Sequence, residues 1–304
     1  MNRFLISGSS FIDPIRNVHS TNMVSIASLL SSGKHIKQIY RLVSEKPKRQ
    51  YNLIVSRISK ENIDQLSIKK PHPQHKHMMS IHSSTTTSFQ KVDLRSKFPP
   101  PFDQGSLGSC TANALCGVIA YDMPGFIGSR LFLYYNERYI EKDVKDDGGA
   151  MLSDGVESLK IYGICPESDW KYDISKFSVK PSKKCYQDAV SHHSVNVKNI
   201  NNTMKDMKNA LSNGYPFVVG ITIYESFESD EVAKTGMVPM PSSSETCNGG
   251  HAVVCVGYDD EKQVWIMRNS WGSKWGDGGY FYLPYAYLLS DDLATDLWCV
   301  TKME

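Results

Sequence analysis

Three short motifs, far apart in the sequence, restrict the folds that this chain can adopt. Cys110 ends a glycine-containing loop that begins near Gln104, His251 follows 141 residues later, and Asn269 lies 159 residues beyond Cys110. A cysteine attacks a carbonyl carbon as its thiolate, so it needs a base beside it and hydrogen-bond donors for the oxyanion that forms. The sequence supplies a candidate for each role, provided that the fold brings the three motifs together.

The segment that begins at Cys110 predicts a helix. Apolar residues recur at helical spacing between Thr111 and Tyr121. The backbone N–H groups and the dipole of a helix N-terminus favour a thiolate. The Gln104 side-chain amide and the Cys110 backbone N–H are the candidate donors to the oxyanion. Most cysteines are small buried apolar residues, and this is our interpretation of Cys116.

His251 and Asn269 are expected at the same end of a β-hairpin. A run of β-branched residues begins at His251 and predicts a buried strand, and Val264–Arg268 predicts the strand that returns. Asn269 can then accept a hydrogen bond from one imidazole nitrogen while the other faces Cys110. The Trp271 ring is expected to shield that hydrogen bond from water. A lone histidine or asparagine at such a position is usually structural, so the specificity lies in the combined pattern.

Together these motifs resemble the papain family of cysteine peptidases, which includes the cathepsins. The resemblance covers about Lys91 to Trp298, with the motifs in the family's order. It implies an α+β papain-like fold of two lobes, a helical lobe over about 102–208 and a β-rich lobe over about 209–300. The active cleft is expected between the lobes. The implied reaction is hydrolysis of a peptide or protein substrate, and no cofactor or metal is implied.

The resemblance also assigns the roles of four catalytic residues. Cys110 is the nucleophile and His251 the acid and base. Asn269 orients the imidazole, and Gln104 donates to the oxyanion. Endopeptidase and exopeptidase activity, and the preferred side chains of the substrate, are not distinguished by these motifs.

Residues that contact the substrate are expected in three places. Gly148 and Gly149 resemble the glycines that pair with the substrate backbone in this family, although a plain turn explains them as well. Gly250 precedes the histidine and allows backbone to approach a ligand closely. Trp271 is the third place at which contact with the substrate is expected.

Two positions of the active-site loop depart from the family pattern. Leu107 stands where the family usually has a cysteine, so the disulfide that commonly braces this loop cannot form. Thr111 replaces the aromatic residue that usually follows the nucleophile. Neither change removes a group that performs chemistry. We therefore expect Cys110 to be a free thiol, and among the remaining cysteines we name only Cys165 and Cys185 as a candidate disulfide pair.

The first 90 residues differ in charge from the rest of the chain. Residues 1–90 carry a net charge of +9, from 13 Lys and Arg against 4 Asp and Glu, and residues 91–304 carry −7. Residues 21–44 hold apolar residues at helical spacing. We interpret residues 1–90 as a basic, propeptide-like leader that docks on a catalytic domain at 91–304 and inhibits it. The alternative is an arm that binds nucleic acid or an anionic membrane.

A linker is expected between the leader and the catalytic domain. The segment 71–88 lacks apolar periodicity, ends in a Ser/Thr-rich run and is a candidate for proteolytic processing. Its histidines, His72, His75 and His77, lack cysteine or carboxylate partners nearby, so we do not interpret them as metal ligands. The N-terminal sequence matches a secretory signal poorly, which favours an intracellular or packaged protein.

Two other functions use the same motifs. An acyl transferase or peptide ligase would form the same thioester but exclude water from it. A catalytically silent binding protein would retain the fold without the activity. The intact set of Cys110, His251, Asn269 and Gln104 argues against the silent protein.

Overall fold

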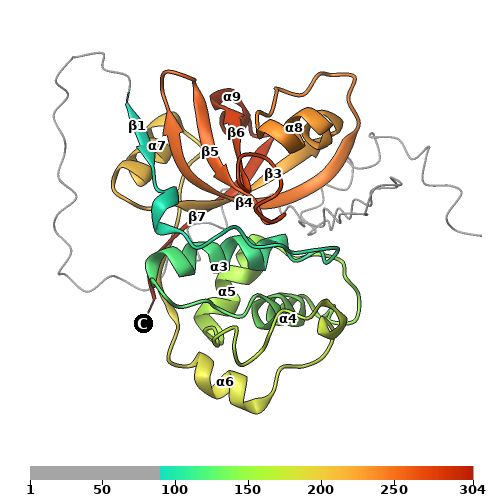
Figure 1. The fold of residues 1–304 in the computed structure, drawn as a ribbon. Coiled ribbons are helices and arrows are strands. Elements are labelled where there is room, and N and C mark those ends of the chain that lie inside the picture. Colours follow the sequence, from blue (N-terminus) through green and yellow to red (C-terminus); the bar gives the residue numbers. More distant parts are fainter. Residues whose placement is uncertain (1–89, 304) are drawn as a thin grey trace, which may run out of the picture. The chain divides into compact units, whose positions relative to one another are not determined.

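The computed structural model describes residues 90–303, which form a group of helices beside an antiparallel β-sheet (Figure 1). The expected leader, its linker and the three linker histidines lie outside the described residues, except for Gln90. The helices are α3 (Cys110–Asp122), α4 (Arg130–Glu141), α5 (Leu152–Ile161), α6 (Lys183–Ala189), α7 (Met204–Ser212), α8 (Asp230–Thr235) and α9 (Tyr285–Leu289). The strands are β1 (Lys91–Asp93), β2 (Ser194–Asn199), β3 (Phe217–Tyr224), β4 (Cys247–Asp259), β5 (Val264–Arg268), β6 (Tyr280–Pro284) and β7 (Ala294–Met303). Short 3₁₀ helices cover Arg95–Lys97, Ile174–Lys176 and Glu225–Glu228.

Helix α3 lies at the centre of the described part of the chain. Every residue from Cys110 to Ala120 is buried. A helix that is buried all round needs partners on every side. On one side α3 contacts β4 and β7, and on another it contacts α4 and α5. The predicted helix at Cys110 is thus present, and its position fixes Cys110 between the helices and the sheet.

The sheet carries the other two motifs. Its strand order is β2-β7-β3-β4-β5-β6, and β1 pairs with the far end of β4. Strands β4 and β5 are antiparallel neighbours, with Val254 opposite Arg268. The chain therefore leaves β5 at Asn269 and returns toward His251, as the hairpin predicted from the sequence requires.

One edge strand lies within the range expected for the helical lobe. Strand β2 pairs with β7 in antiparallel register, with Val197 opposite Val300. Its sequence, Ser-Val-Asn-Val-Lys-Asn, has few apolar residues, as is common for a strand at the edge of a sheet. The sheet therefore includes residues before 208. Pairing with β7 makes this segment a strand, although its sequence alone predicts a strand only weakly.

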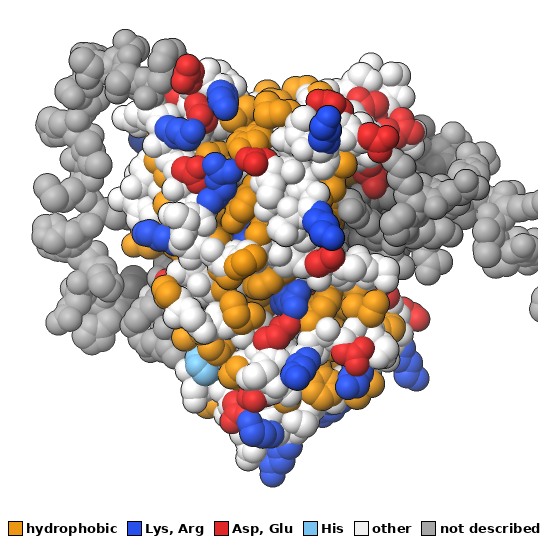
Figure 2. Space-filling view, in the orientation of Figure 1, with side chains coloured by type: hydrophobic (Ala, Val, Ile, Leu, Met, Phe, Trp, Pro, Cys, Tyr) orange, Lys and Arg blue, Asp and Glu red, His pale blue; other side chains and the backbone are white. Residues whose placement is uncertain are grey.

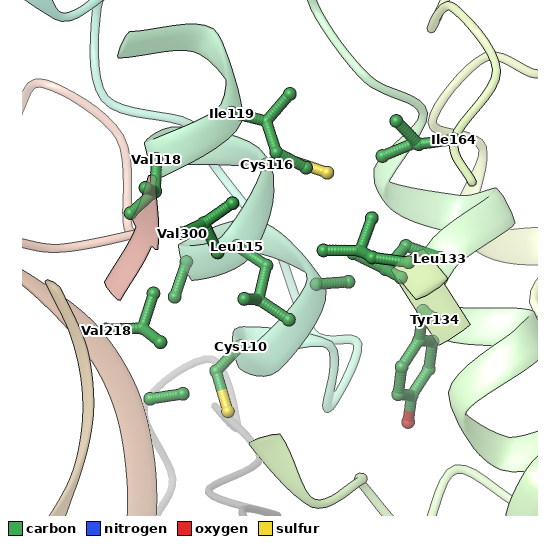
Figure 3. Close-up of a cluster of buried hydrophobic side chains, with 14 of the residues drawn as sticks. Cys110, Leu115, Cys116, Val118, Ile119, Leu133, Tyr134, Ile164, Val218 and Val300 are labelled. Atoms are coloured by element: carbon green, nitrogen blue, oxygen red, sulfur yellow. The ribbon is translucent and has the colours of Figure 1, made fainter. Parts of the chain in front are cut away.

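Two apolar clusters cover the two faces of the sheet. Val218 and Val254 belong to the cluster formed with α3, α4 and α5, whereas Val219 and Val253 belong to the opposite cluster. This alternation follows from the two-residue period of side chains along a strand. Figure 3 shows the first cluster around α3, with Val218 and Val300 from the sheet and Leu133 from α4. None of the helices within residues 90–303 is long and apolar enough to cross a membrane.

Candidate active site

Cys110 is the first residue of α3 and is fully buried. Its neighbour Ser109 is the N-cap residue but makes no capping hydrogen bond with its side chain, so the first backbone N–H groups of α3 are not capped by it. Figure 3 shows that Cys116 lies further along the helix, with its sulfur directed toward Ile164. Only Cys110 therefore combines a helix N-terminus with proximity to β4.

His251 and Asn269 form the hydrogen bond that the sequence predicts. His251 Nε2 lies 2.8 Å from Asn269 Oδ1, and both side chains are buried. The backbone N–H of Ser270 also donates to Asn269 Oδ1 at 2.8 Å, which fixes the orientation of the amide. With its amide oxygen toward the ring, Asn269 accepts a hydrogen bond from the Nε2–H group and leaves Nδ1 as the basic nitrogen of a neutral imidazole.

An aromatic cluster covers the imidazole. The Trp271 ring stacks on His251 with 4.9 Å between ring centroids, and Trp271 is 6% exposed. Trp275 and Phe227 pack around Trp271 in edge-to-face contacts. Exclusion of water strengthens the Asn–His hydrogen bond, because the local dielectric constant falls. Trp271 therefore lies where the sequence predicts.

Hydrogen bonds hold Gln104 at its backbone N–H and at its side-chain amide. Its backbone N–H donates to Ser270 O at 2.9 Å, and the Ser270 hydroxyl donates to Gln104 Oε1 at 2.5 Å. Its Nε2 donates one hydrogen to Leu107 O at 2.9 Å. The amide nitrogen carries a second hydrogen, which is the candidate donor to an oxyanion. Ser270 directly follows Asn269 in the sequence, so its hydrogen bonds connect Gln104 to the segment that carries Asn269.

The electrostatics of Cys110 depend mainly on burial. The pKa of the Cys110 thiol is raised to about 12, mainly by burial and to a smaller extent by the nearby Glu137 carboxyl. Hydrogen bonds from the backbone N–H groups of Ala252 and Thr111 lower it. The contact with Ala252 brings the sulfur beside the residue that follows His251. A thiolate at this position therefore requires transfer of the proton to an adjacent base.

Glu137 is a buried acid that the sequence analysis missed. The Thr111 hydroxyl donates to Glu137 Oε2 at 2.8 Å, so the residue that replaces the usual aromatic side chain has a defined partner. Burial raises the pKa of Glu137 to about 8, although the Thr111 hydrogen bond lowers it. Glu137 lies between the polar residues Asn136 and Arg138 in α4, so no signal in the sequence distinguished it.

The glycines expected to contact substrate lie in two places. Gly148 and Gly149 follow α4 in the loop that leads to α5, and Gly149 has a φ of 83°, which favours glycine. Gly250 is buried in β4 and pairs with Thr222 of β3. The loop of Gly148 is joined to the nucleophile loop, because the Gly108 N–H donates to both carboxylate oxygens of Asp147 at 3.1 Å.

All seven cysteines are free thiols. Cys110 is therefore not part of a disulfide, as the substitution by Leu107 suggests. The candidate bridge between Cys165 and Cys185 is not formed, although the two buried thiols are hydrogen-bonded neighbours. Two neighbouring thiols need not form a disulfide. Burial raises the pKa of the Cys165 thiol, and this disfavours the thiolate through which a disulfide forms.

Tyr172 was not identified from the sequence as part of this site, and Asp147 was noted only as the residue before Gly148 and Gly149, without a role on the nucleophile loop. Each is hydrogen-bonded to the loop between Gln104 and Cys110. Asp147 is 39 residues from its partner in the sequence, and Tyr172 is 68 residues from its partner. No periodic pattern connects such distant residues. Within residues 90–303, no group of three or more His, Cys, Asp and Glu side chains is arranged to hold a metal ion.

Comparisons with known proteins agree with this geometry. Residues 89–287 match the sequence model of the papain family cysteine proteases. An uncharacterized peptidase C1-like protein of Acanthamoeba polyphaga mimivirus is 42% identical over 66% of this chain and 69% of its own length. Cysteine proteinase 3 of Entamoeba histolytica is 27% identical over 67% of this chain and 65% of its own length, so the match spans less than two thirds of that relative.

A solved structure is similar as well. Xylellain, a cysteine protease from Xylella fastidiosa, is 40% identical, with a TM-score of 0.65 over 70% of this chain and 86% of the xylellain chain. The similarity therefore extends from the motifs to the arrangement of helices and strands.

Proposed function

Because this chain belongs to the papain family of cysteine proteases, hydrolases that act on peptide bonds, we propose that it cleaves them through a thioester on Cys110. The observation that carries this proposal is the buried hydrogen bond of 2.8 Å between His251 Nε2 and Asn269 Oδ1. It leaves Nδ1 as the nitrogen that exchanges protons with the thiol. A merely structural histidine would not need a fixed tautomer next to a helix N-terminal cysteine.

Acylation begins with transfer of the Cys110 proton to His251. The thiolate attacks the carbonyl carbon, and the carbonyl oxygen becomes an oxyanion that receives hydrogen bonds from Gln104 Nε2 and the Cys110 backbone N–H. The tetrahedral intermediate then collapses. The C–N bond breaks, and His251 gives its proton to the leaving amine, which departs and leaves a thioester.

Deacylation reverses the roles of the same groups. His251 removes a proton from water, and the hydroxide attacks the thioester carbonyl carbon. The C–S bond breaks, the carboxylic acid leaves, and the proton returns to the Cys110 sulfur. Gly148, Gly149 and Gly250 are proposed to lie against the substrate backbone, because no side chain there blocks its approach.

We further propose that the basic leader restrains the catalytic domain at residues 91–304. The opposite net charges of residues 1–90 and 91–304 favour association of the two segments. Cleavage within about 71–90 is expected to release the restraint.

The proposed nucleophile is tested by comparing two buried cysteines of the same helix. The protein is treated with a thiol-reactive peptidyl epoxide before and after removal of the leader, and the labelled residue is identified by mass spectrometry. We expect Cys110→Ala to abolish labelling and peptidase activity, and Cys116→Ala to retain both. Activity in the Cys110→Ala variant would reject the assignment.

A further inference from the structure

We propose that Asp147 and Tyr172 are positioning residues that hold the loop from Gln104 to Cys110 in the conformation that stabilises the oxyanion. The inference rests on the proposed function. Neither side chain is assigned a contact with the reacting atoms. Both act on the loop that aims the two oxyanion donors, and they contact different residues of it.

This loop needs external support. Its donors are the Gln104 side chain and the Cys110 backbone N–H, and both must point at one oxygen atom. The loop contains Gly105, whose φ is 61°, and Gly108, so its backbone is intrinsically permissive. Within the loop, Leu107 accepts from Gln104 Nε2 at 2.9 Å and donates to Gln104 O at 3.4 Å. Since all cysteines are free, no covalent bridge restrains it.

Asp147 supports the loop from the side of α4. Its two carboxylate oxygens both accept from the Gly108 N–H at 3.1 Å, and the buried Tyr134 hydroxyl of α4 donates to Asp147 Oδ1. Arg138, also on α4, donates to Val144 O at 3.1 Å and to Asp146 O at 3.2 Å. The segment that carries Asp147 is therefore itself fixed to the helix. Hydrogen bonds to a charged acceptor are stronger than neutral ones.

Tyr172 supports the same loop at Gln104 and at Ser109. Its hydroxyl donates to Gln104 O at 3.0 Å and accepts from Ser109 Oγ at 2.5 Å. It thus contacts the residue that supplies one oxyanion donor and the residue that precedes Cys110. The Arg130 guanidinium lies 4.1 Å from the centre of the Tyr172 ring and is paired with Glu167 at 2.5 Å, which holds the ring in place.

Loss of either support is expected to act on catalysis more than on substrate affinity. Without the Asp147 carboxylate, the Gly108 N–H loses its acceptor and the loop can shift. A displacement of about 1 Å of a positioned group costs on the order of 100-fold in rate. Interactions that strengthen only in the transition state affect kcat rather than KM. Both variants should therefore lower kcat and leave KM nearly unchanged.

The test uses the full-length chain after cleavage of its leader, with the concentration of reactive Cys110 measured by titration with a peptidyl epoxide. Asp147→Ala is expected to lower kcat per titrated site about 10- to 100-fold. Asp147→Asn keeps one acceptor oxygen for Gly108 and is expected to recover part of that loss. Asp146→Ala removes the same charge from the neighbouring exposed side chain and should match wild type.

Tyr172→Phe provides a second measurement, because it removes the hydroxyl but keeps the ring against Arg130. It is expected to lower kcat about 10-fold with KM nearly unchanged. The proposal is overturned if Asp147→Ala and Tyr172→Phe both retain wild-type kcat per titrated site, or if the loss of activity equals the loss of titratable thiol. Absence of turnover by the wild-type enzyme would instead reject the proposed function.

Discussion

Glu137 shows how one buried side chain influences the chemistry of its neighbours. It lies below the first turn of α3, accepts a hydrogen bond from Thr111 and raises the pKa of the Cys110 thiol. Its second oxygen, Oε1, has no hydrogen-bond partner among residues 90–303. An ionised carboxylate is costly at such a position, so the folded protein favours the neutral acid.

The stability of the protein should therefore fall with pH because of Glu137. Burial raises its pKa from the ordinary value of 4.5 to about 8. Between these values the folded state binds more protons than the unfolded state, so the free energy of unfolding decreases as the pH rises. At about 1.4 kcal/mol per pH unit, this interval corresponds to roughly 5 kcal/mol.

Denaturant unfolding of wild type and Glu137→Gln at pH 5 and pH 8 measures this contribution. The variant keeps an acceptor for Thr111 but cannot ionise, so it should gain stability relative to wild type as the pH rises. Glu157→Gln changes a half-exposed glutamate of α5 and serves as the control. A difference between Glu137→Gln and wild type that is the same at both pH values would contradict the buried-acid interpretation.

At the scale of elements, α4 connects the helices to the loop that carries the candidate substrate-binding glycines. Arg138 is fully buried on α4 and donates to the backbone oxygens of Val144, Asp146 and Phe177. Its guanidinium also lies 4.0 Å from the centre of the Tyr134 ring. A planar group with five N–H donors suits several separate carbonyls, whereas a lysine offers a single ammonium.

Arg138→Lys should therefore destabilise the protein by about 2–4 kcal/mol, because buried carbonyl oxygens lose their partners. Denaturant unfolding measures the change. The reverse substitution at an exposed ion pair, Lys176→Arg beside Asp173, should alter stability by less than about 0.5 kcal/mol. Equal stability of the two variants would show that Arg138 does not hold the loop to α4.

At the scale of the whole molecule, charge is distributed unevenly along the chain. The net charge of +2 combines +9 in residues 1–90 with −7 in residues 91–304. Figure 2 shows acidic side chains gathered near α8, whose first turn contains Asp230 and Glu231. Acidic surface on the catalytic domain is the feature that a basic inhibitory segment would recognise.

Removal of the leader should raise activity, and salt should reduce the difference. Exposed charges are screened over ~8–10 Å at 0.1–0.15 M ionic strength, so inhibition by the leader should weaken as salt increases. The measurement compares the full-length chain with a chain that starts near Lys91, on one peptide substrate across a salt series. If the shorter chain is folded but no faster at any salt concentration, binding of the isolated leader to vesicles and to nucleic acid should be measured.

The sequence alone predicted much of the fold and the candidate catalytic residues. The helix at Cys110, the strand at His251 and the hairpin that returns Asn269 are encoded by local periodicity, so they can be recognised without tertiary contacts. The order and spacing of the motifs then indicated the family. These features depend on residues that are close in sequence or on motifs that are specific in combination.

Only the tertiary structure revealed what surrounds these residues. The contacts of Thr111 with Glu137, of Gly108 with Asp147 and of Gln104 with Tyr172 span 26, 39 and 68 residues. Each depends on where two separate elements come to lie, and a polar side chain gives no sign of its distant partner in the sequence. Burial likewise results from the packing of the whole domain, and for that reason the raised pKa values of Cys110 and Glu137 could not be predicted from the sequence.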